Sequence, residues 1–249
     1  FNKCLVGETE VLDYSNGRMR SIESIYNKQQ KTVVLSLGDN QKLHSGKAEE
    51  IHYNGIKKVY ELTTRSGRSL KATANHPFLK YTGYELLENL KKGDLLATPR
   101  VIKYKADKKI EKYKLRVLGY LLSEGNLCHP SGVYFYSSQK EEIKDFTKSA
   151  LRFSNTDCKA DYSKSATAIY LGRKNKKWPS GIWNWLNKLG LLNKRAVEKF
   201  IPEDVFRVST DRLAAFIGAL WQGDGCIFED KVGQIFYSTS SERLADQLK

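Results

Sequence analysis

Two acidic residues stand at matching positions in the second half of the sequence. Glu124 follows the apolar stretch VLGYLLS, Asp224 follows the apolar stretch IGALWQG, and a glycine comes directly after each acid. The acids are 100 positions apart, and similar segments follow them: VYFYSSQKEEIKDFTK and QIFYSTSSERLADQLK. In this alignment Tyr136 corresponds to Tyr237. Two matches in the same order indicate a duplicated unit of about 100 residues.

Each acid is expected at the end of an apolar helix. Small residues would let the two helices pack closely and bring both carboxylates to one place; these are Gly119, Ser123, Gly218, Ala219 and Gly223. The glycine after each acid suits a helix C-terminus with positive φ. Two carboxylates on a basic surface suit Mg²⁺, which takes oxygen ligands and can activate water for phosphodiester hydrolysis. The alternative is a pair of glycine-capped helices with incidental acids.

The elements that must position these acids alternate between helix and strand. Helical periodicity occurs in LRVLGYLLSEG, SQKEEIKDFTKSALRF and IWNWLNKLGLL, and strand composition occurs in GVYFYSS and TAIYLGR. The sequence therefore predicts an α+β second half. Trp178, Trp183 and Trp185 have the helical or turn spacing of core residues.

The first hundred or so residues predict short strands separated by turns. VVLSLGDNQKL is an apolar run closed by a turn, and VYELTTRSGRSLKATANHPFL predicts a hairpin around Ser66 and Gly67. ENLKKGDLLATP predicts another turn and short strand, before the lysine-rich linker KYKADKKIEKYK. We expect a compact, mainly antiparallel β domain.

The duplicated segments resemble the paired motifs of the LAGLIDADG homing endonucleases. The resemblance makes Glu124 and Asp224 metal-binding and catalytic acids, with Mg²⁺ as cofactor. KFIPEDV resembles the segment just upstream of the second motif, which makes Lys199 the candidate catalytic lysine that orients or polarises the attacking water. The family usually has aspartate in the first motif, so Glu124 is a departure.

Such an endonuclease implies double-stranded DNA as a partner. We expect the strands around residues 133–138 and 167–173 to lie on the duplex, with alternate side chains facing the groove. Arg173, Lys174, Lys176 and Lys177 would contact phosphates. A solvated basic loop is the alternative for this cluster.

The first half resembles the amino-terminal splicing blocks of inteins, with CLVGETEVL at the start and TANHPFL about seventy residues later. Inteins with a LAGLIDADG domain inserted into a β splicing domain are a known arrangement, and the motif order here fits it. By this resemblance residues 1–3 are the end of a host-protein flank (an N-extein). Residues 4–100 are the N-terminal part of a Hint splicing domain. Residues 101–249 are the endonuclease domain, with a first copy at about 115–210 and an incomplete second copy from about 213.

The intein resemblance implies a reaction at the bond between Lys3 and Cys4 that needs no cofactor. The Cys4 thiol attacks the Lys3 carbonyl in an N-to-S acyl shift and forms a thioester. By similarity His76 gives a proton to the scissile nitrogen, and Thr73 hydrogen-bonds and holds the peptide, with Asn75 as an assisting residue.

Complete splicing also needs a carboxy-terminal His-Asn pair followed by Cys, Ser or Thr. The sequence contains no His-Asn pair. We therefore expect this chain alone to form at most the thioester, and we expect its partners to be the flanking exteins and a C-terminal intein fragment or continuation.

Charge and composition are consistent with these partners and exclude several classes. The 249 residues carry a formal charge of +14, which favours a polyanionic partner. The cysteines and histidines form neither CxxC pairs nor zinc spacing, and no apolar run is long enough for a membrane. We expect a cytoplasmic protein with no membrane partner. The alternatives are a stand-alone LAGLIDADG endonuclease or maturase, a DNA-binding module whose nuclease has decayed, and a hedgehog-type autoprocessing domain, which carries no endonuclease repeat.

Overall fold

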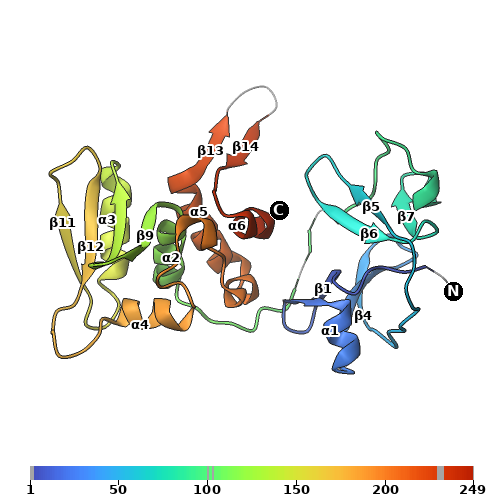
Figure 1. The fold of residues 1–249 in the computed structure, drawn as a ribbon, viewed down its shortest axis with the longest axis horizontal. Coiled ribbons are helices and arrows are strands. Elements are labelled where there is room, and N and C mark those ends of the chain that lie inside the picture. Colours follow the sequence, from blue (N-terminus) through green and yellow to red (C-terminus); the bar gives the residue numbers. More distant parts are fainter. Residues whose placement is uncertain (1–2, 100, 103, 229–232, 249) are drawn as a thin grey trace. The chain divides into compact units, whose positions relative to one another are not determined.

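The computed structural model describes residues 3–99, 101–102, 104–228 and 233–248 (Figure 1). The chain divides into two compact units: unit 1 extends to Asp107, and unit 2 spans Lys108–Leu248. No helix in the described residues is long and apolar enough to cross a membrane.

Unit 1 is built from antiparallel strand pairs. They are β1 (Glu10–Asp13) with β2 (Arg18–Ser21), β3 (Val33–Leu37) with β4 (Leu43–Lys47), β5 (Tyr60–Thr63) with β6 (Ser69–Ala72), and β7 (Pro77–Lys80) with β8 (Gly83–Leu86). The predicted mainly antiparallel β character is therefore confirmed. The predicted turn is present between β5 and β6, where Gly67 has a φ of 79° that glycine adopts at no steric cost.

Two parts of unit 1 differ from the prediction. The sequence IESIYN forms a short helix, α1 (Ile22–Asn27), which begins where the side chain of Ser21 accepts a hydrogen bond from Ser24 N. The strand predicted in ENLKKGDLLATP is wrong: this segment forms the 3₁₀ helix η1 (Leu87–Asn89) and a single bridge between Lys80 and Leu96.

In its described residues, unit 2 contains a four-stranded antiparallel sheet, a separate hairpin and five α-helices. The sheet has the order β11 (Asp157–Asp161), β12 (Thr167–Gly172), β10 (Gly132–Ser137), β9 (Gly125–His129), and the hairpin pairs β13 (Gly225–Phe228) with β14 (Gln234–Tyr237). The helices are α2 (Lys112–Glu124), α3 (Lys140–Ala150), α4 (Gly181–Lys188), α5 (Thr210–Asp224) and α6 (Glu242–Leu248), with 3₁₀ helices η2 (Ala196–Glu198) and η3 (Glu203–Arg207). The predicted α+β character is confirmed.

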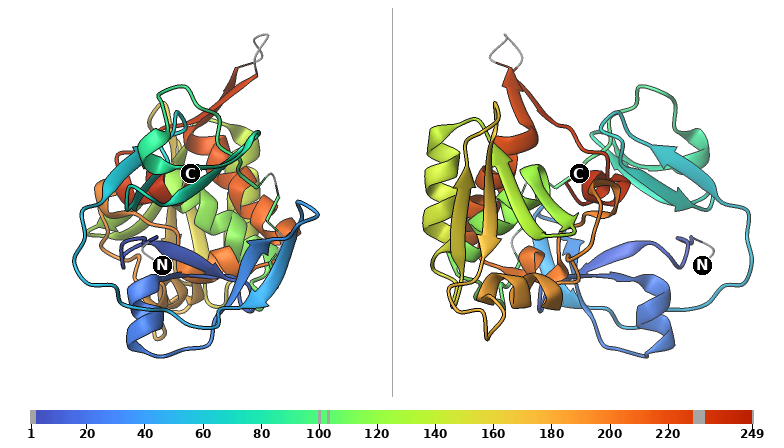
Figure 2. Two further views of the ribbon diagram at one scale, coloured as in Figure 1. Left: turned by 90° about the vertical axis from the view of Figure 1, so that its right-hand side faces the viewer. Right: turned by 60° about the vertical axis from the view of Figure 1, so that its left-hand side comes forward.

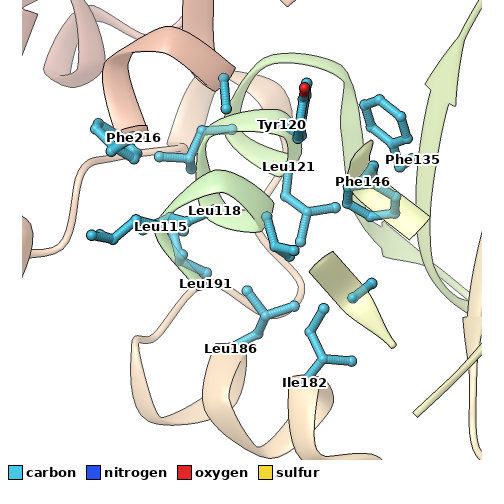
Figure 3. Packing of buried hydrophobic residues seen from close by; sticks show 14 of the residues in the cluster. Leu115, Leu118, Tyr120, Leu121, Phe135, Phe146, Ile182, Leu186, Leu191 and Phe216 are labelled. Atoms are coloured by element: carbon cyan, nitrogen blue, oxygen red, sulfur yellow. The ribbon is translucent and has the colours of Figure 1, made fainter. Parts of the chain in front are cut away.

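The apolar core of unit 2 surrounds α2. Leu115, Leu118 and Leu121 are fully buried and point from α2 toward side chains of α4, α5 and the sheet (Figure 3). The rings of Phe135 and Phe146 stack at a centroid distance of 4.2 Å, which fixes α3 on the sheet. Each such buried side chain contributes roughly 1.5–3 kcal/mol, so α2 is the element on which the rest of unit 2 is assembled.

The tryptophans of unit 2 are not all core residues. Trp185 packs on Phe153 with ring centroids 5.3 Å apart, but Trp183 is 45% exposed and Trp178 is 61% exposed. The prediction is wrong for these two residues. Helix α4 directs Ile182 and Leu186 into the core, and Trp183 lies about 100° further around the helix.

The hairpin β13–β14 repeats the pairing of β9 with β10, with a different register from that expected. Gly225 pairs with Tyr237, whereas Gly125 pairs with Phe135. The structural equivalent of Tyr237 is therefore Phe135, and the expected match to Tyr136 is wrong by one residue. The hairpin extends away from the helices of unit 2 in both views of Figure 2, and Ile227 and Ile235 are about two thirds exposed.

Candidate functional site

The amino-terminal segment lies antiparallel beside β6. Leu5 forms a bridge with Ala72, and Thr73 N donates to the carbonyl oxygen of Cys4 at 3.0 Å. In return Cys4 N donates to Thr73 Oγ1, also at 3.0 Å. This nitrogen belongs to the Lys3–Cys4 peptide bond, so the side chain of Thr73 contacts the bond that the intein resemblance marks as scissile.

The hydroxyl of Thr73 has two acceptors within reach. Thr73 is 5% exposed, and its Oγ1 can donate to Asn75 Oδ1 at 2.8 Å or, at the longer distance of 3.5 Å, to Cys4 O. When it donates to the nearer Asn75, an oxygen lone pair is left for the Cys4 N–H. Asn75 thus contacts Thr73 and favours an orientation of its hydroxyl in which Oγ1 accepts a hydrogen bond from the scissile nitrogen.

His76 closes the same turn, since its backbone N donates to Thr73 O at 2.9 Å. Its ring packs edge-on against Phe78 at 5.4 Å, and in the described structure the buried Nδ1 has no hydrogen-bond partner. Burial lowers the pKa of the His76 imidazole, and the positive charge of Lys3 lowers this pKa further. Lys3 therefore lies close enough to the ring for the imidazole to sense its charge.

A cavity of about 790 Å³ lies beside Cys4 and is lined by residues from the start of the chain, α1 and the segment between β4 and β5. Asn54 lines this cavity and its Nδ2 donates to Cys4 Sγ at 3.4 Å. Sequence reasoning missed Asn54, because it lies 50 residues from Cys4 in a segment without regular structure or a motif.

In unit 2 the acids Glu124 and Asp224 are the last residues of α2 and α5. The two helices approach so closely that glycine is required: a Cβ on Gly223 would lie 2.4 Å from Ser123 Oγ and 3.0 Å from Glu124 Cγ. A Cβ on Gly119 would lie 2.6 Å from Phe216 O. Gly218, by contrast, faces open space, so its expected place in the contact is wrong.

The glycines after the acids are needed for a different reason from the one expected. Gly125 and Gly225 have φ angles of −88° and −87°, not positive values. A Cβ on Gly125 would lie 2.4 Å from Leu121 O, and one on Gly225 would lie 2.2 Å from Trp221 Cδ1. Each helix turns directly into a strand over its own last turn, which leaves no room for a side chain.

Burial and neighbouring charges shift the pKa values of the two acids. Burial raises the pKa of Glu124, and the negative charge of Asp224 raises it further. Burial also raises the pKa of Asp224, while Lys199 and the hydroxyl of Tyr237, which donates to Asp224 Oδ2 at 3.4 Å, lower it. Two partly buried carboxylates at neighbouring helix ends provide oxygen ligands of the kind that Mg²⁺ takes, and the charge of such an ion would offset the cost of ionising both acids. In the described residues no group of three or more His, Cys, Asp or Glu side chains could hold a metal.

Lys199 lies at the end of α2 and is 5% exposed. Its Nζ donates to the carbonyl oxygens of Leu122, Ser123 and Gly125 at 3.0, 3.1 and 2.8 Å. An ammonium group has three donors, so all of them are used by the backbone at the end of α2. Burial lowers the pKa of Lys199 to about 8, although Asp224 and Glu124 raise it.

The predicted basic cluster follows β12 and is exposed; its members are Arg173, Lys174, Lys176 and Lys177. Asn155 holds this loop, since its Nδ2 donates to Trp178 O at 2.8 Å and its Oδ1 accepts from Asn175 N at 2.7 Å. Sequence reasoning missed a row of tyrosines on the neighbouring sheet.

That row lies on the sheet face opposite the core. Tyr134 is stacked with Tyr136 at 6.1 Å and tilted on Tyr170 at 5.2 Å. The alternation in GVYFYS was the available signal, because Val133, Phe135 and Ser137 are buried and the tyrosines point the other way.

Two family models match this chain. The family model described as intein splicing domain matches residues 12–220, and the model described as LAGLIDADG-like domain matches residues 211–249. The first range includes Thr73, His76, Glu124 and Lys199; the second includes Asp224.

Curated relatives match nearly all of this chain with a small part of their own length. The replicative DNA helicase DnaB of Rhodothermus marinus is 30% identical over 97% of this chain and 27% of the helicase. The Synechocystis sp. helicase DnaB is 30% identical over 99% of this chain and 29% of its own length. The chain thus spans less than a third of these relatives.

Among solved structures, a DnaB intein from Synechocystis sp. is 32% identical, with a TM-score of 0.38 over 39% of this chain and 70% of that one. The family model covers most of the sequence, from residue 12 to residue 220. The chain therefore belongs to the intein splicing-domain family, and its C-terminal region is LAGLIDADG-like.

Proposed function

We propose that this chain performs the first step of protein splicing at the Lys3–Cys4 bond. The observation that carries the proposal is the 3.0 Å hydrogen bond from Cys4 N to Thr73 Oγ1. It holds the peptide bond between the nucleophile and its target in one orientation, which reduces the entropy lost in reaching the transition state.

The step conserves atoms and protons. The Cys4 sulfur loses its proton and bonds to the Lys3 carbonyl carbon, the carbon–nitrogen bond breaks, and the nitrogen takes up a proton to become the amino group of Cys4. His76 is the proposed proton donor to this nitrogen. Its lowered pKa makes its protonated ring a stronger acid than an ordinary histidine, which favours proton transfer to the leaving nitrogen.

Hydroxylamine at neutral pH provides a test, because under this condition it cleaves thioesters but leaves the peptide bonds of the chain intact, including Asn16–Gly17 and Asn54–Gly55, which alkaline hydroxylamine would attack. We expect the segment that ends at Lys3 to be released as a hydroxamate from the wild-type chain. A Cys4→Ala variant should remain whole, since no thioester can form. Equal stability of both proteins in hydroxylamine would contradict the proposal. The host exteins and a C-terminal intein fragment, which would supply the residues that complete splicing, are the proposed protein partners.

We also propose that unit 2 cleaves double-stranded DNA with Mg²⁺. The observation that favours this second function is the close approach of the two helix ends that carry Glu124 and Asp224, where the charge of Asp224 acts on Glu124. Their carboxylates would hold the ion, which supplies a polarised water and charge stabilisation when bound. In this chain Lys199 would keep the end of α2, and with it Glu124, in place.

DNA is the proposed ligand because the exposed side chains of unit 2 suit it. Arg173, Lys174, Lys176 and Lys177 can neutralise phosphates, and the tyrosines of β10 and β12 present flat polar surfaces beside them. The net charge of +14 favours the same polyanion.

The nuclease proposal is tested by incubating the chain with plasmids that carry a library of long sites. We expect linear product in Mg²⁺, no product in EDTA, and no product from the double variant Glu124→Gln, Asp224→Asn. Binding of the library without cleavage in Mg²⁺ would favour a DNA-binding module whose nuclease has decayed.

A further inference from the structure

The side chain of Asn54 contacts the sulfur of Cys4. Asn54 lies between β4 and β5, directly before Gly55, which has a φ of 74°. The turn carries the amide into the cavity beside Cys4, where Nδ2 lies 3.4 Å from Sγ. Hydrogen bonds to sulfur are longer than those to oxygen because the sulfur atom is larger, and 3.4 Å is a short distance for such a contact.

We propose that Asn54 activates and orients the Cys4 thiol by donating a hydrogen bond to its sulfur. The proposal deepens the proposed thioester step and rests on it. Asn54 would then act on the nucleophile, while Thr73 acts on the nitrogen of the same residue.

An amide N–H stabilises a thiolate more than a thiol, because the negative sulfur is the stronger acceptor. The carboxamide carries no charge and does not titrate, so it can donate this hydrogen bond at every pH. The bond also restricts rotation of the Cys4 side chain. Cys4 N is held by Thr73 and Cys4 Sγ by Asn54, at 3.0 and 3.4 Å respectively. With both ends held, fewer orientations of the thiol compete with attack on the Lys3 carbonyl.

His52 also lines the cavity but is the weaker candidate for this role. Its Nε2 pairs with Glu50 Oε2 at 3.0 Å, and both side chains are more than 70% exposed. The described polar contact of His52 is with Glu50, whereas that of Asn54 is with the sulfur itself.

The competing explanation is that Asn54 serves only the turn, since Asn before Gly is common in turns. The test therefore measures the reactivity of the sulfur directly. The full chain is treated with iodoacetamide near pH 7, and alkylation of each cysteine is followed by peptide mass spectrometry. The exposed Cys128 and Cys226 of unit 2 provide internal references in the same tube.

We expect Asn54→Ala to slow alkylation of Cys4 about threefold relative to Cys128, since the sulfur loses the hydrogen-bond donor that orients it and supports its negative charge. Asn54→Asp should slow it further, because it keeps the shape and the turn but replaces the donor with a negative charge. Ile56→Ala, on the same segment and 98% exposed, should leave the rate unchanged.

Wild-type alkylation rates in both Asn54 variants would overturn the proposal, as would equal slowing by Ile56→Ala. Thermal unfolding of each variant shows whether the turn is preserved, and Asn54→Asp decides the matter if Asn54→Ala unfolds. Thioester formation is measured separately with hydroxylamine. If the wild type forms no thioester, the proposed splicing step fails, while the alkylation rates still decide whether Asn54 acts on the sulfur.

Discussion

The backbone nitrogen of Cys4 donates to the hydroxyl of Thr73 at 3.0 Å, across a separation of 69 residues. The reciprocal bond from Thr73 N to Cys4 O has the same length. Together they hold the Lys3–Cys4 bond against the end of β6. The backbone hydrogen bond from Thr73 N to Cys4 O would be enough to anchor this segment. The hydrogen bond to the Thr73 side chain is the one that contacts the scissile nitrogen.

Removing the Thr73 hydroxyl should slow thioester formation. Thr73→Val keeps the size and β-branching of the side chain but leaves Cys4 N without its side-chain acceptor. A neutral hydrogen bond is worth about 1 kcal/mol, so we expect about a fivefold slower rate of hydroxylamine cleavage. Thr73→Ser, which keeps the hydroxyl, should restore most of the rate. Equal rates for valine and serine would mean that the hydroxyl has no role.

Replacing Lys3 should raise the pKa of His76. The charge of Lys3 is the second cause of the lowered pKa, and burial is the first. With Lys3→Ala we expect a rise that stays below 6.5, because burial remains; Lys3→Arg should cause no change. The measurement is an NMR titration of the His76 ring. An unchanged pKa in Lys3→Ala would show that the two side chains are far apart.

The lowered pKa of His76 also predicts how the free energy of unfolding changes with pH. The folded state binds fewer protons than the unfolded state, so the contribution of a neutral His76 is present above the unfolded pKa, near 6.5. It is lost as pH falls through the folded pKa. Urea unfolding of unit 1 should therefore show lower stability at pH 5 than at pH 7, and this difference should shrink in His76→Phe. If the stability difference between pH 5 and pH 7 is as large in His76→Phe as in the wild type, it arises from other groups.

Lys199 should stabilise unit 2 in addition to any role in chemistry. Lys199→Met leaves three buried or partly buried carbonyl groups without their donor, and we expect the free energy of unfolding to fall by about 2–4 kcal/mol. Lys199→Arg keeps the charge but has a planar donor set that does not match three converging carbonyls, so it should recover only part of the loss. Urea unfolding measures both. A methionine variant as stable as the wild type would show that the three bonds contribute nothing.

Tyr237 should affect the pKa of Asp224 and its affinity for Mg²⁺. Its hydroxyl donates to Asp224 and lowers the pKa of that carboxyl, so Tyr237→Phe should raise this pKa and weaken Mg²⁺ binding. Phenylalanine is the residue at the equivalent position of the first copy, Phe135, and therefore fits the local packing. We expect DNA cleavage by the variant to need a higher Mg²⁺ concentration, with the same rate at saturation. An unchanged Mg²⁺ dependence would separate Tyr237 from the metal site.

Much of the architecture followed from sequence patterns. Apolar periodicity is a property of each segment alone, so the helices around Glu124 and Asp224 and the hairpin at Gly67 could be predicted. The close packing of α2 on α5 could also be predicted from the sequence, because small residues at positions 119, 123, 219 and 223 let two apolar helices approach closely.

The predictions that were wrong concern features that depend on which other residues a given residue contacts in the folded chain. The glycines at 125 and 225 were expected in a positive-φ cap, but the structure requires them because the chain turns back over Leu121 and Trp221. The Tyr237 register could not be predicted, because the two hairpins differ in length between the glycine and its paired aromatic residue. Asn54 contacts Cys4 only in the folded chain, 50 residues away in sequence, and no local sequence pattern predicts that contact.

The central claim is that the Lys3–Cys4 bond rearranges to a thioester, and intact-mass spectrometry in a strong thiol tests it most directly. The folded chain is incubated with dithiothreitol at neutral pH, beside a Cys4→Ala control. We expect the wild type alone to lose the mass of residues 1–3 and to leave a product that begins at Cys4. A wild-type chain that stays folded and keeps its full mass, as the control does, would contradict the account.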